Sequence, residues 1–286
     1  MTQFDKIAGK VGYNDAAHTY THVDDGKRYT SVTTLIHNYV PEFKGDYWAT
    51  YKACKDVMEQ EGTWYAYKIQ AGGWEDVVQH FESSYKINLS TKTIEAVLKR
   101  KQWYLDKWDA DRDNSCILGS EIHNSLEDAA YVSQQIREGE ANYEVTEENI
   151  LNIQDFTGNG VYPELLMYSD TFMVAGQADK VFREGMDVDI HDYKTCKSID
   201  MEGFRGETLL EPLTHLQNAN YWIYCLQLSM YGYILEMMGF KVRNLYMHHI
   251  HGKNREDKKR NAGVKTYELP YMKEDVIRIL ELNKAA

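Results

Sequence analysis

Residues 188–195, with the sequence Val-Asp-Ile-His-Asp-Tyr-Lys-Thr, are the segment that most restricts how this chain can fold. The apolar residues Val188 and Ile190 alternate with other residues, which predicts a buried β-strand. Since side chains two residues apart lie on one face of a strand, Asp192 and Lys194 share that face. A carboxylate and an ammonium are costly to bury unless they are paired. Taken alone, the segment fits a structural ion pair or a strand end that meets solvent.

Two further segments carry carboxylates in largely apolar sequence. Residues 162–168 predict an edge strand or strand start that carries Glu164. Residues 172–183 predict a second strand that carries Gly176 and Asp179. Three consecutive strands would each bring a carboxylate into the core, and each carboxylate costs desolvation free energy. The pattern therefore favours a functional cluster over a chance arrangement.

A helix predicted at residues 116–137 presents two neighbouring rows at four-residue spacing. The apolar row consists of Leu118, Ile122, Leu126 and Ala130, and the adjacent row of Gly119, His123 and Glu127. The apolar row should face the core, so the second row lies at its border. A single histidine in such a place is usually a hydrogen-bonded structural residue. Residues 138–148 are acidic and predict an exposed loop, and the following segment starts as a helix.

The C-terminal part of the chain predicts a long helix at residues 214–238, in which Gln227 and Tyr231 are i, i+4 neighbours beside the apolar stripe. Residues 241–251 predict a strand. His249 and His251 share one of its faces, but no third metal ligand is visible nearby. The basic segment 253–265 is either a solvated loop or a phosphate contact. Its candidate contacts are Lys258, Lys259 and Arg260.

The N-terminal third carries no motif that points to chemistry. Residues 19–23 and 28–32 flank Asp24-Asp25-Gly26, which predicts a β-hairpin. Ser31 or Thr33 could cap a short helix that Pro41 ends. Further helices are predicted at residues 46–60, 74–85 and 93–109.

The charge balance limits the kind of nucleic-acid contact that the chain can make. It has 32 Lys and Arg against 44 Asp and Glu, a net charge of −12, so any such contact must be local. No apolar run reaches membrane-spanning length, and the first residues lack the apolar core of a signal peptide. Four scattered cysteines without a Cys-x-x-Cys pair predict a reduced, cytoplasmic protein without a zinc or iron–sulfur site.

Five motifs in order resemble the RecB-like branch of the PD-(D/E)XK nuclease superfamily. They are Gly119-x3-His123-x3-Glu127, Glu164, Gly176-x2-Asp179, Asp192-Tyr193-Lys194-Thr195 and Gln227-x3-Tyr231. The resemblance covers residues from about 118 to 235, and residues 31–34 (Ser-Val-Thr-Thr) resemble phage-encoded members. It implies an α/β fold, a central mixed β-sheet flanked by helices.

The resemblance also implies roles for individual residues. Asp179 and Asp192 would bind one or two Mg²⁺ or Mn²⁺ ions, with His123 as a third ligand and the Tyr193 carbonyl as a further one. Lys194 would be the catalytic lysine. Gln227 and Tyr231 would support the site or contact DNA. An iron–sulfur cluster is not expected, since no cysteine follows Cys225.

The chemistry of these residue types agrees with such roles. A phosphodiester is anionic, and metal ions held by carboxylates could screen it and lower the pKa of bound water. Lys194 could orient or deprotonate that water and neutralise developing charge. Glu127 and Glu164 would then be outer ligands or hold the inner ones in place.

Together these observations predict a nuclease-like core at residues 115–286, with a hairpin and a mostly helical region at residues 1–114 packed on it. The expected function is metal-dependent DNA hydrolysis, by an exonuclease that acts on DNA ends in replication, repair or recombination. A recombination or single-strand-binding protein is a possible partner, and the cytoplasm (the host's, if phage-encoded) the expected location.

Two other hypotheses remain at this point. One is a nuclease-like fold that has lost catalysis and binds DNA or a protein partner, but such a module has no need of the Asp–Asp–Lys set. The other is a purely structural α/β protein, which must explain charges on three strands without a metal.

Overall fold

The structure is a computed structural model that describes residues 6–138, 156–252, 258 and 263–285. The chain forms two compact units: Met1–Pro41 together with Leu118–Ala286, here called unit 1, and Glu42–Ile117, called unit 2. The division differs from the predicted boundary between residues 114 and 115, because residues 1–41 belong with the C-terminal part. The expected loop at residues 138–148 and the helix start after it lie almost wholly outside the described residues. No described helix is long and apolar enough to cross a membrane.

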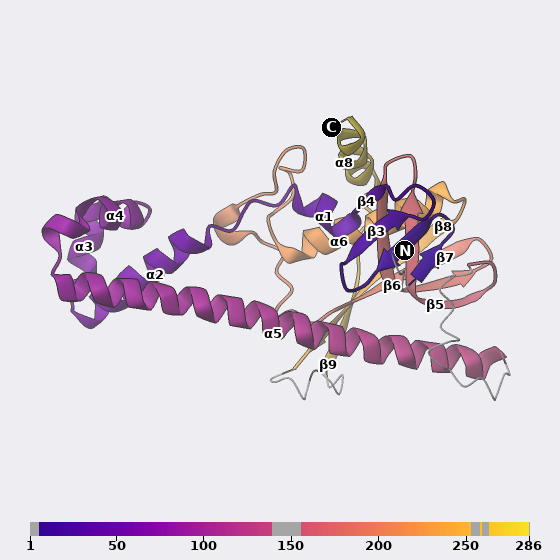
Figure 1. Ribbon diagram of the computed structural model, residues 1–286, viewed down its shortest axis with the longest axis horizontal. Coiled ribbons are helices and arrows are strands. Elements are labelled where there is room, and N and C mark those ends of the chain that lie inside the picture. Colours follow the sequence, from indigo (N-terminus) through magenta and orange to yellow (C-terminus); the bar gives the residue numbers. More distant parts are fainter. Residues whose placement is uncertain (1–5, 139–155, 253–257, 259–262, 286) are drawn as a thin grey trace. The chain divides into compact units, whose positions relative to one another are not determined.

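Unit 1 is built on a mixed nine-stranded β-sheet (Figure 1). Its C-terminal strands are β5 (Gly160–Ser169), β6 (Val174–Glu184), β7 (Asp187–Lys194), β8 (Lys241–His251) and β9 (Gly263–Glu268). Among these five strands the neighbours are antiparallel except β7 and β8, which are parallel and joined through helix α6 (Asn220–Met237). The strand β4, described below, also pairs with β6 in parallel. The strands expected at residues 162–168, 172–183, 188–195 and 241–251 are confirmed, as is the α/β class with a mixed sheet.

Strands β6 and β7 diverge along their length. They pair from Glu184↔Asp187 to Lys180↔His191 and no further. Beyond this point the first residues of β6 pair with β4 (Arg28–Ser31) instead, at Thr30↔Val174 and Ser31↔Ala175. A fork therefore opens between the two strands, and we refer to it as the β6–β7 fork.

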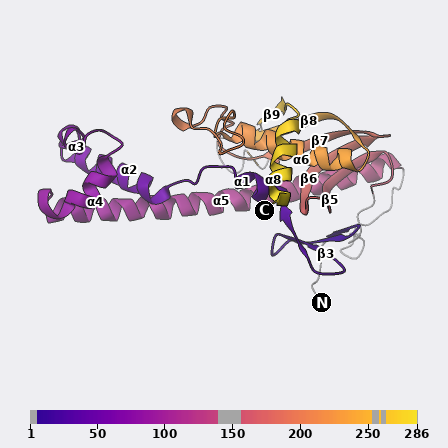
Figure 2. The same cartoon turned by 90° about the horizontal axis from the view of Figure 1, so that it is seen from above.

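The N-terminal residues form an antiparallel meander that joins the same sheet (Figures 1 and 2). It comprises β1 (Lys6–Ala8), β2 (Val11–Asn14), β3 (Thr19–His22) and β4. The pairing Tyr20↔Tyr29 confirms the predicted hairpin, whereas β1 and β2 were not predicted. Ser31 caps helix α1 (Val32–His37), because its Oγ accepts the Thr34 N–H at 3.0 Å.

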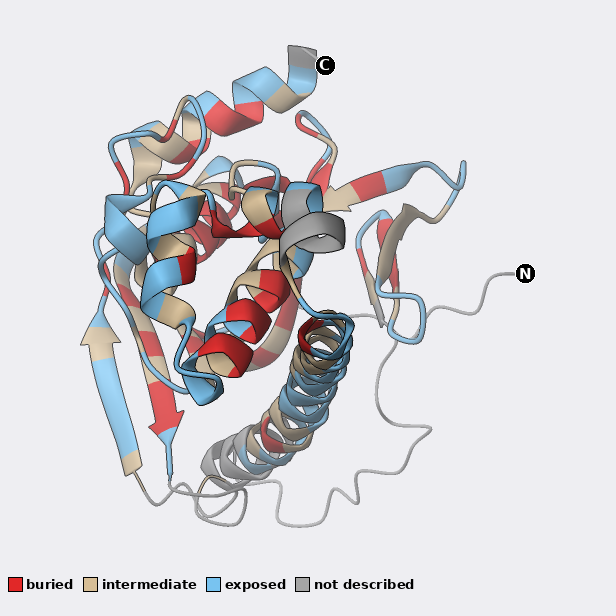
Figure 3. Ribbon diagram, turned by 90° about the vertical axis from the view of Figure 1, so that its left-hand side faces the viewer, coloured by how far each residue is buried: buried red, intermediate tan, exposed pale blue. Residues whose placement is uncertain are grey.

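Helix α6 forms the centre of the core of unit 1 and contacts β5, β6, β7, β8, α1 and α8 (Lys273–Ala285). Buried residues gather where the helices meet the sheet (Figure 3). The predicted start of this helix at Thr214 is wrong, since α6 begins at Asn220. Residues 195–219 are instead a compact loop with a 3-10 turn, η1 (Phe204–Gly206), and they bury Leu209, Leu213 and Leu216 without forming an α-helix.

Unit 2 is helical. It contains α2 (Gly45–Gln60), α3 (Trp64–Ala71), α4 (Val77–Asn88) and the first part of α5 (Thr91–Glu138). The expectation of two helices at residues 93–109 and 116–137 is wrong, because α5 is continuous. The sequence between them has no proline or glycine to break the helix, and Arg112 pairs with Asp109 one turn away at 2.9 Å. Helix α3 was not predicted; it ends at Ala71 and is followed by Gly72, whose φ of 96° favours glycine.

Gly176 on β6 provides a test of the packing beside the fork. A Cβ atom there would lie 2.7 Å from Cε1 of Tyr231 and 2.9 Å from Cγ2 of Val32, both of which are buried. Gly176→Ala should therefore lower the free energy of unfolding by about 1–3 kcal/mol, as overpacked cores do. Equilibrium unfolding in urea, monitored by circular dichroism, measures this change.

Gly158→Ala is the matched control for that measurement. Among the described residues, its added Cβ would meet the Tyr162 hydroxyl alone, at an ordinary 3.7 Å. Its unfolding free energy should change by less than about 0.5 kcal/mol. Equal stabilities of the two variants would contradict the packing described around Gly176.

Candidate functional site

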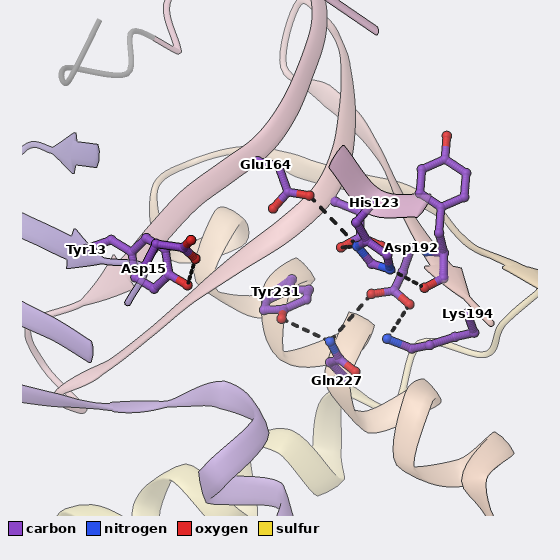
Figure 4. A network of polar contacts seen from close by, with 10 residues as sticks. Tyr13, Asp15, His123, Glu164, Asp192, Lys194, Gln227 and Tyr231 are labelled. Carbon is purple, nitrogen blue, oxygen red and sulfur yellow. Dashed lines mark hydrogen bonds and ion pairs between the residues drawn. The ribbon is translucent and has the colours of Figure 1, made fainter. Parts of the chain in front are cut away.

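Three side chains from α5, β5 and β6 converge at the β6–β7 fork. Figure 4 shows two of them, His123 and Glu164, facing one another. One ligand atom each from His123, Glu164 and Asp179 lies within 4.8 Å of the others. His123 Nδ1 is 3.3 Å from Asp179 Oδ1 and 4.0 Å from Glu164 Oε1. A ring nitrogen and two carboxylates at this spacing can hold one divalent cation.

The backbone of Glu164 adopts a conformation that is unusual for its residue type. Its φ is 47°, in the left-handed region that costs most non-glycine residues free energy. The register of β5 and β6 places Glu164 opposite Asp179, between the pairs Pro163↔Lys180 and Leu165↔Ala178. Glu164, which the sequence suggested as an outer group, is thus in the three-residue cluster itself.

The backbone of Tyr193 joins this cluster to the end of β7. Its N–H donates to Asp179 Oδ2 at 2.6 Å, and its carbonyl oxygen lies 3.0 Å from His123 Nε2. The expected role of this carbonyl was direct metal ligation. Here it accepts a hydrogen bond from the imidazole and fixes the ring so that Nδ1 faces the two carboxylates, an arrangement typical of metal-binding histidines.

Asp192 and Lys194 form a second group beside the first. Lys194 Nζ is 2.7 Å from Asp192 Oδ2, and the Asp192 side chain is 2% exposed. From α6, Gln227 Nε2 donates to Asp192 Oδ1 at 3.5 Å and to the Tyr231 hydroxyl oxygen at 3.1 Å. The structure therefore brings Gln227 and Tyr231 to the site. It places Asp192 outside the cluster of His123, Glu164 and Asp179.

The charges of these groups are strongly coupled. Burial alone would lower the pKa of His123, but its hydrogen bond to Asp179 and the charge of that carboxylate raise it to about 9. Burial would raise the pKa of Asp179, and the His123 hydrogen bond outweighs this effect and lowers it. Burial raises the pKa of Asp192 to about 6 against the opposing charge of Lys194. The Lys194 pKa is raised: burial would lower it, but the charge of Asp192 outweighs that effect.

The N-terminal meander borders the site. Tyr13 and Tyr20 stack with ring centroids 4.9 Å apart, and the Tyr13 hydroxyl donates to Asp15 at 3.0 Å (Figure 4). Burial raises the pKa of Tyr20, and the negative charge of Glu164 adds to the shift. The hairpin of β3 and β4 therefore lies close enough to the cluster for Tyr20 to feel the charge of Glu164. The sequence predicted the hairpin but not its position beside the cluster.

The segment that follows Lys194 is held by side chains from three directions. Lys258 Nζ donates to the Thr195 carbonyl oxygen at 2.8 Å, and His249 Nε2 lies 2.8 Å from the Cys196 carbonyl oxygen. Asn220 Nδ2 donates to the Ser198 carbonyl oxygen at 2.8 Å. The Lys258 ammonium thus contacts the protein itself, although the sequence suggested it as a phosphate contact.

Lys259 and Arg260 lie outside the described residues, as does the side chain of Glu127. Two residues were missed from the sequence, Asn220 and Tyr224, the ring of which lies against Lys194. From the sequence, His249 was considered only as half of a metal-binding pair with His251, whereas His249 contacts the Cys196 carbonyl oxygen. Tyr224 had a sequence signal, since it lies three residues before Gln227 on the same helix.

Comparisons with known proteins leave the family open. No known family matches the sequence, and no curated protein matches it. Among solved structures, the crystal structure of SSO0001 is similar over 43% of this chain and 48% of that one, at 15% identity and a TM-score of 0.24. The chain thus spans about half the length of that structure, and a TM-score this low supports no conclusion about fold or function.

Proposed function

We propose that this protein is a divalent-metal-dependent nuclease that hydrolyses DNA at the β6–β7 fork. The observation that carries the proposal is the position of the three-ligand cluster beside the Asp192–Lys194 pair, in which the carboxylate is buried and the ammonium side chain is partly exposed. The metal-binding cluster and the Lys194 ammonium lie close together, so a bound metal ion and the ammonium would both stabilise an anionic substrate such as a phosphodiester. A structural ion pair alone does not require the neighbouring cluster of a histidine and two carboxylates.

The proposal also includes a PD-(D/E)XK-like core for unit 1. The supporting features are the succession of α5, β5, β6, β7, α6 and β8, and the placement of the family-like motifs at one end of β6 and β7. Motifs dispersed over more than 100 residues of sequence meet at one site, as a shared catalytic function requires.

The protein residues have distinct tasks in this proposal. His123, Glu164 and Asp179 hold the cation, which supplies Lewis-acid stabilisation of the phosphate and a more acidic water when bound. Lys194 donates hydrogen bonds to the phosphate oxygens or to the attacking water. Asp192 keeps the Lys194 ammonium charged and in place, and Gln227 orients the Asp192 carboxylate.

We further propose that the substrate is DNA with a free end. A chain of net charge −12 offers little positive surface for a continuous duplex, so its contact with DNA should be short. A recombination or single-strand-binding protein remains a proposed partner that could deliver such ends.

Linear DNA should accordingly be degraded, and covalently closed circular DNA of the same sequence should be largely spared. The assay incubates equal masses of both forms with the protein and Mg²⁺ or Mn²⁺, and follows acid-soluble nucleotides and nicking. Nicking of the closed circle at the rate of linear degradation would indicate an endonuclease.

The same assay distinguishes the proposed enzyme from a binding module. Binding of linear DNA without cleavage in either ion, measured by fluorescence anisotropy, would replace the nuclease proposal with that of a catalytically inactive DNA-binding fold. Cleavage that persists undiminished in excess EDTA would contradict the metal dependence.

A further inference from the structure

The ammonium of Lys194 has a second partner besides Asp192. Its Nζ lies 4.8 Å from the centroid of the Tyr224 ring, within the range of a cation–π interaction. We infer that Tyr224 is a positioning residue, whose ring holds the Lys194 ammonium where it meets the scissile phosphate. The catalytic meaning of this inference rests on the proposed function, whereas the contact itself can be tested separately.

The Tyr224 ring is well placed to act as a fixed support. Burial raises the pKa of its hydroxyl group and the neighbouring Cys196 side chain adds to the shift, so the phenol stays neutral at physiological pH. The Cys196 sulfur in turn donates to the Ser198 carbonyl oxygen at 3.3 Å and accepts from Asn220 Nδ2 at 3.8 Å. The ring is therefore anchored at one end by α6 and at the other by the segment that follows β7.

A lysine needs such a support because its side chain has four rotatable bonds and a compact charge. The ion pair with Asp192 constrains the ammonium from β7, and Tyr224 constrains it from α6. Tyr224 and Gln227 are three residues apart on α6, so one side of this helix contacts both members of the ion pair. Together these contacts leave the ammonium little freedom to leave the site.

Tyr224→Leu removes the aromatic face, while Tyr224→Phe keeps it and removes only the hydroxyl group. The leucine variant should lower kcat for cleavage of linear DNA about tenfold, the size expected when a partly desolvated cation–π contact is lost. Its KM should stay within about twofold of wild type, because a local change in the Lys194 position leaves most DNA contacts intact. The phenylalanine variant should retain at least about a third of wild-type kcat.

Tyr233→Leu is the matched control. Tyr233 is also on α6 and lies under a lysine, with Lys273 Nζ 5.8 Å from its ring centroid, but it makes no described contact with the site. This variant should cleave DNA at the wild-type rate. A loss in Tyr233→Leu equal to that in Tyr224→Leu, or equal losses in the Phe and Leu variants of Tyr224, would overturn the inference in favour of a general packing effect.

A spectroscopic measurement decides the contact even if no cleavage is found. In the NMR spectrum of the lysine NH₃⁺ groups, the Lys194 signal, identified by its loss in Lys194→Arg, should be shifted by the ring current of Tyr224. The shift should persist in Tyr224→Phe and disappear in Tyr224→Leu. An unshifted Lys194 signal in the wild-type protein would overturn the inference, whereas absent cleavage with a shifted signal would refute only the nuclease proposal.

Discussion

Asp192→Asn should lower the rate of DNA cleavage by about a hundredfold to a thousandfold. The carboxylate is buried and 2.7 Å from Lys194, so its charge keeps the ammonium protonated and oriented. An amide of the same shape removes that charge, and the loss of one preorganised electrostatic group commonly costs a factor of about 10²–10³. Steady-state cleavage of linear DNA measures the effect, with circular dichroism to verify the fold.

Asp189→Asn is the matched control for Asp192→Asn. Asp189 is on the same strand and is also buried, but its partners are Arg243, at 2.6 Å, and Asn244, at 2.8 Å, away from the cluster. This variant should keep its activity and lose stability. Equal loss of activity in both variants would show that a general weakening of β7, and not the site chemistry, explains the effect.

The stability lost in Asp189→Asn should depend on pH in a defined direction. Burial alone would raise the pKa of Asp189, but its hydrogen bonds from Arg243 outweigh this and lower it. A carboxyl group with a lowered pKa in the folded state stabilises the fold above its unfolded pKa of about 3.9 and loses that contribution as the pH falls through the folded value. The difference from wild type should therefore shrink below about pH 4.

Cleavage should require a divalent cation, with Mn²⁺ at least as effective as Mg²⁺, and with Ca²⁺ or excess EDTA giving none. An imidazole ligand suits Mn²⁺ better than Mg²⁺, and Ca²⁺ prefers more oxygen ligands at longer distances. His123→Ala should weaken Mn²⁺ binding by roughly 10- to 100-fold or more, since even residues that only support a ligand have effects of this size. Calorimetric titration of Mn²⁺ measures binding without reference to activity.

His215→Ala is the control for the His123 variant. His215 is 51% exposed and pairs with Asp275 instead of the cluster, so its removal should leave Mn²⁺ binding unchanged. Wild-type Mn²⁺ affinity and wild-type rates in His123→Ala would refute the ligand role of His123.

The strands and their carboxylates could be predicted because their signals are local. The alternation of Val188 and Ile190 predicted β7, largely apolar sequence predicted β5 and β6, and a turn signal predicted the hairpin of β3 and β4. The site could be predicted only as a set of residues. Its internal division, with Glu164 in the ligand cluster and Asp192 paired to Lys194, depends on where β6 and β7 diverge, and no local pattern encodes that point.

The errors have similar causes. A break was expected within α5 at residues 110–115, which are polar but continue the helix; Arg112 pairs there with Asp109 one turn away. The start of α6 was predicted too early because Leu216 and Ala219 continue the apolar stripe of the helix. Both residues are buried, but they belong to the loop that precedes α6. Apolar spacing reports burial, and several backbone conformations can bury the same residues.

At Glu164, the backbone conformation that lowers the stability of the fold belongs to the same residue whose carboxylate is proposed to bind the cation. A residue with a φ of 47° typically relaxes when glycine or asparagine replaces it, because either adopts the left-handed region at lower cost. Selection for a more stable fold alone would therefore remove this carboxylate, while selection for cation binding would keep it. Libraries screened only for thermal tolerance should accumulate glycine or asparagine at this position, and libraries screened for cleavage should not.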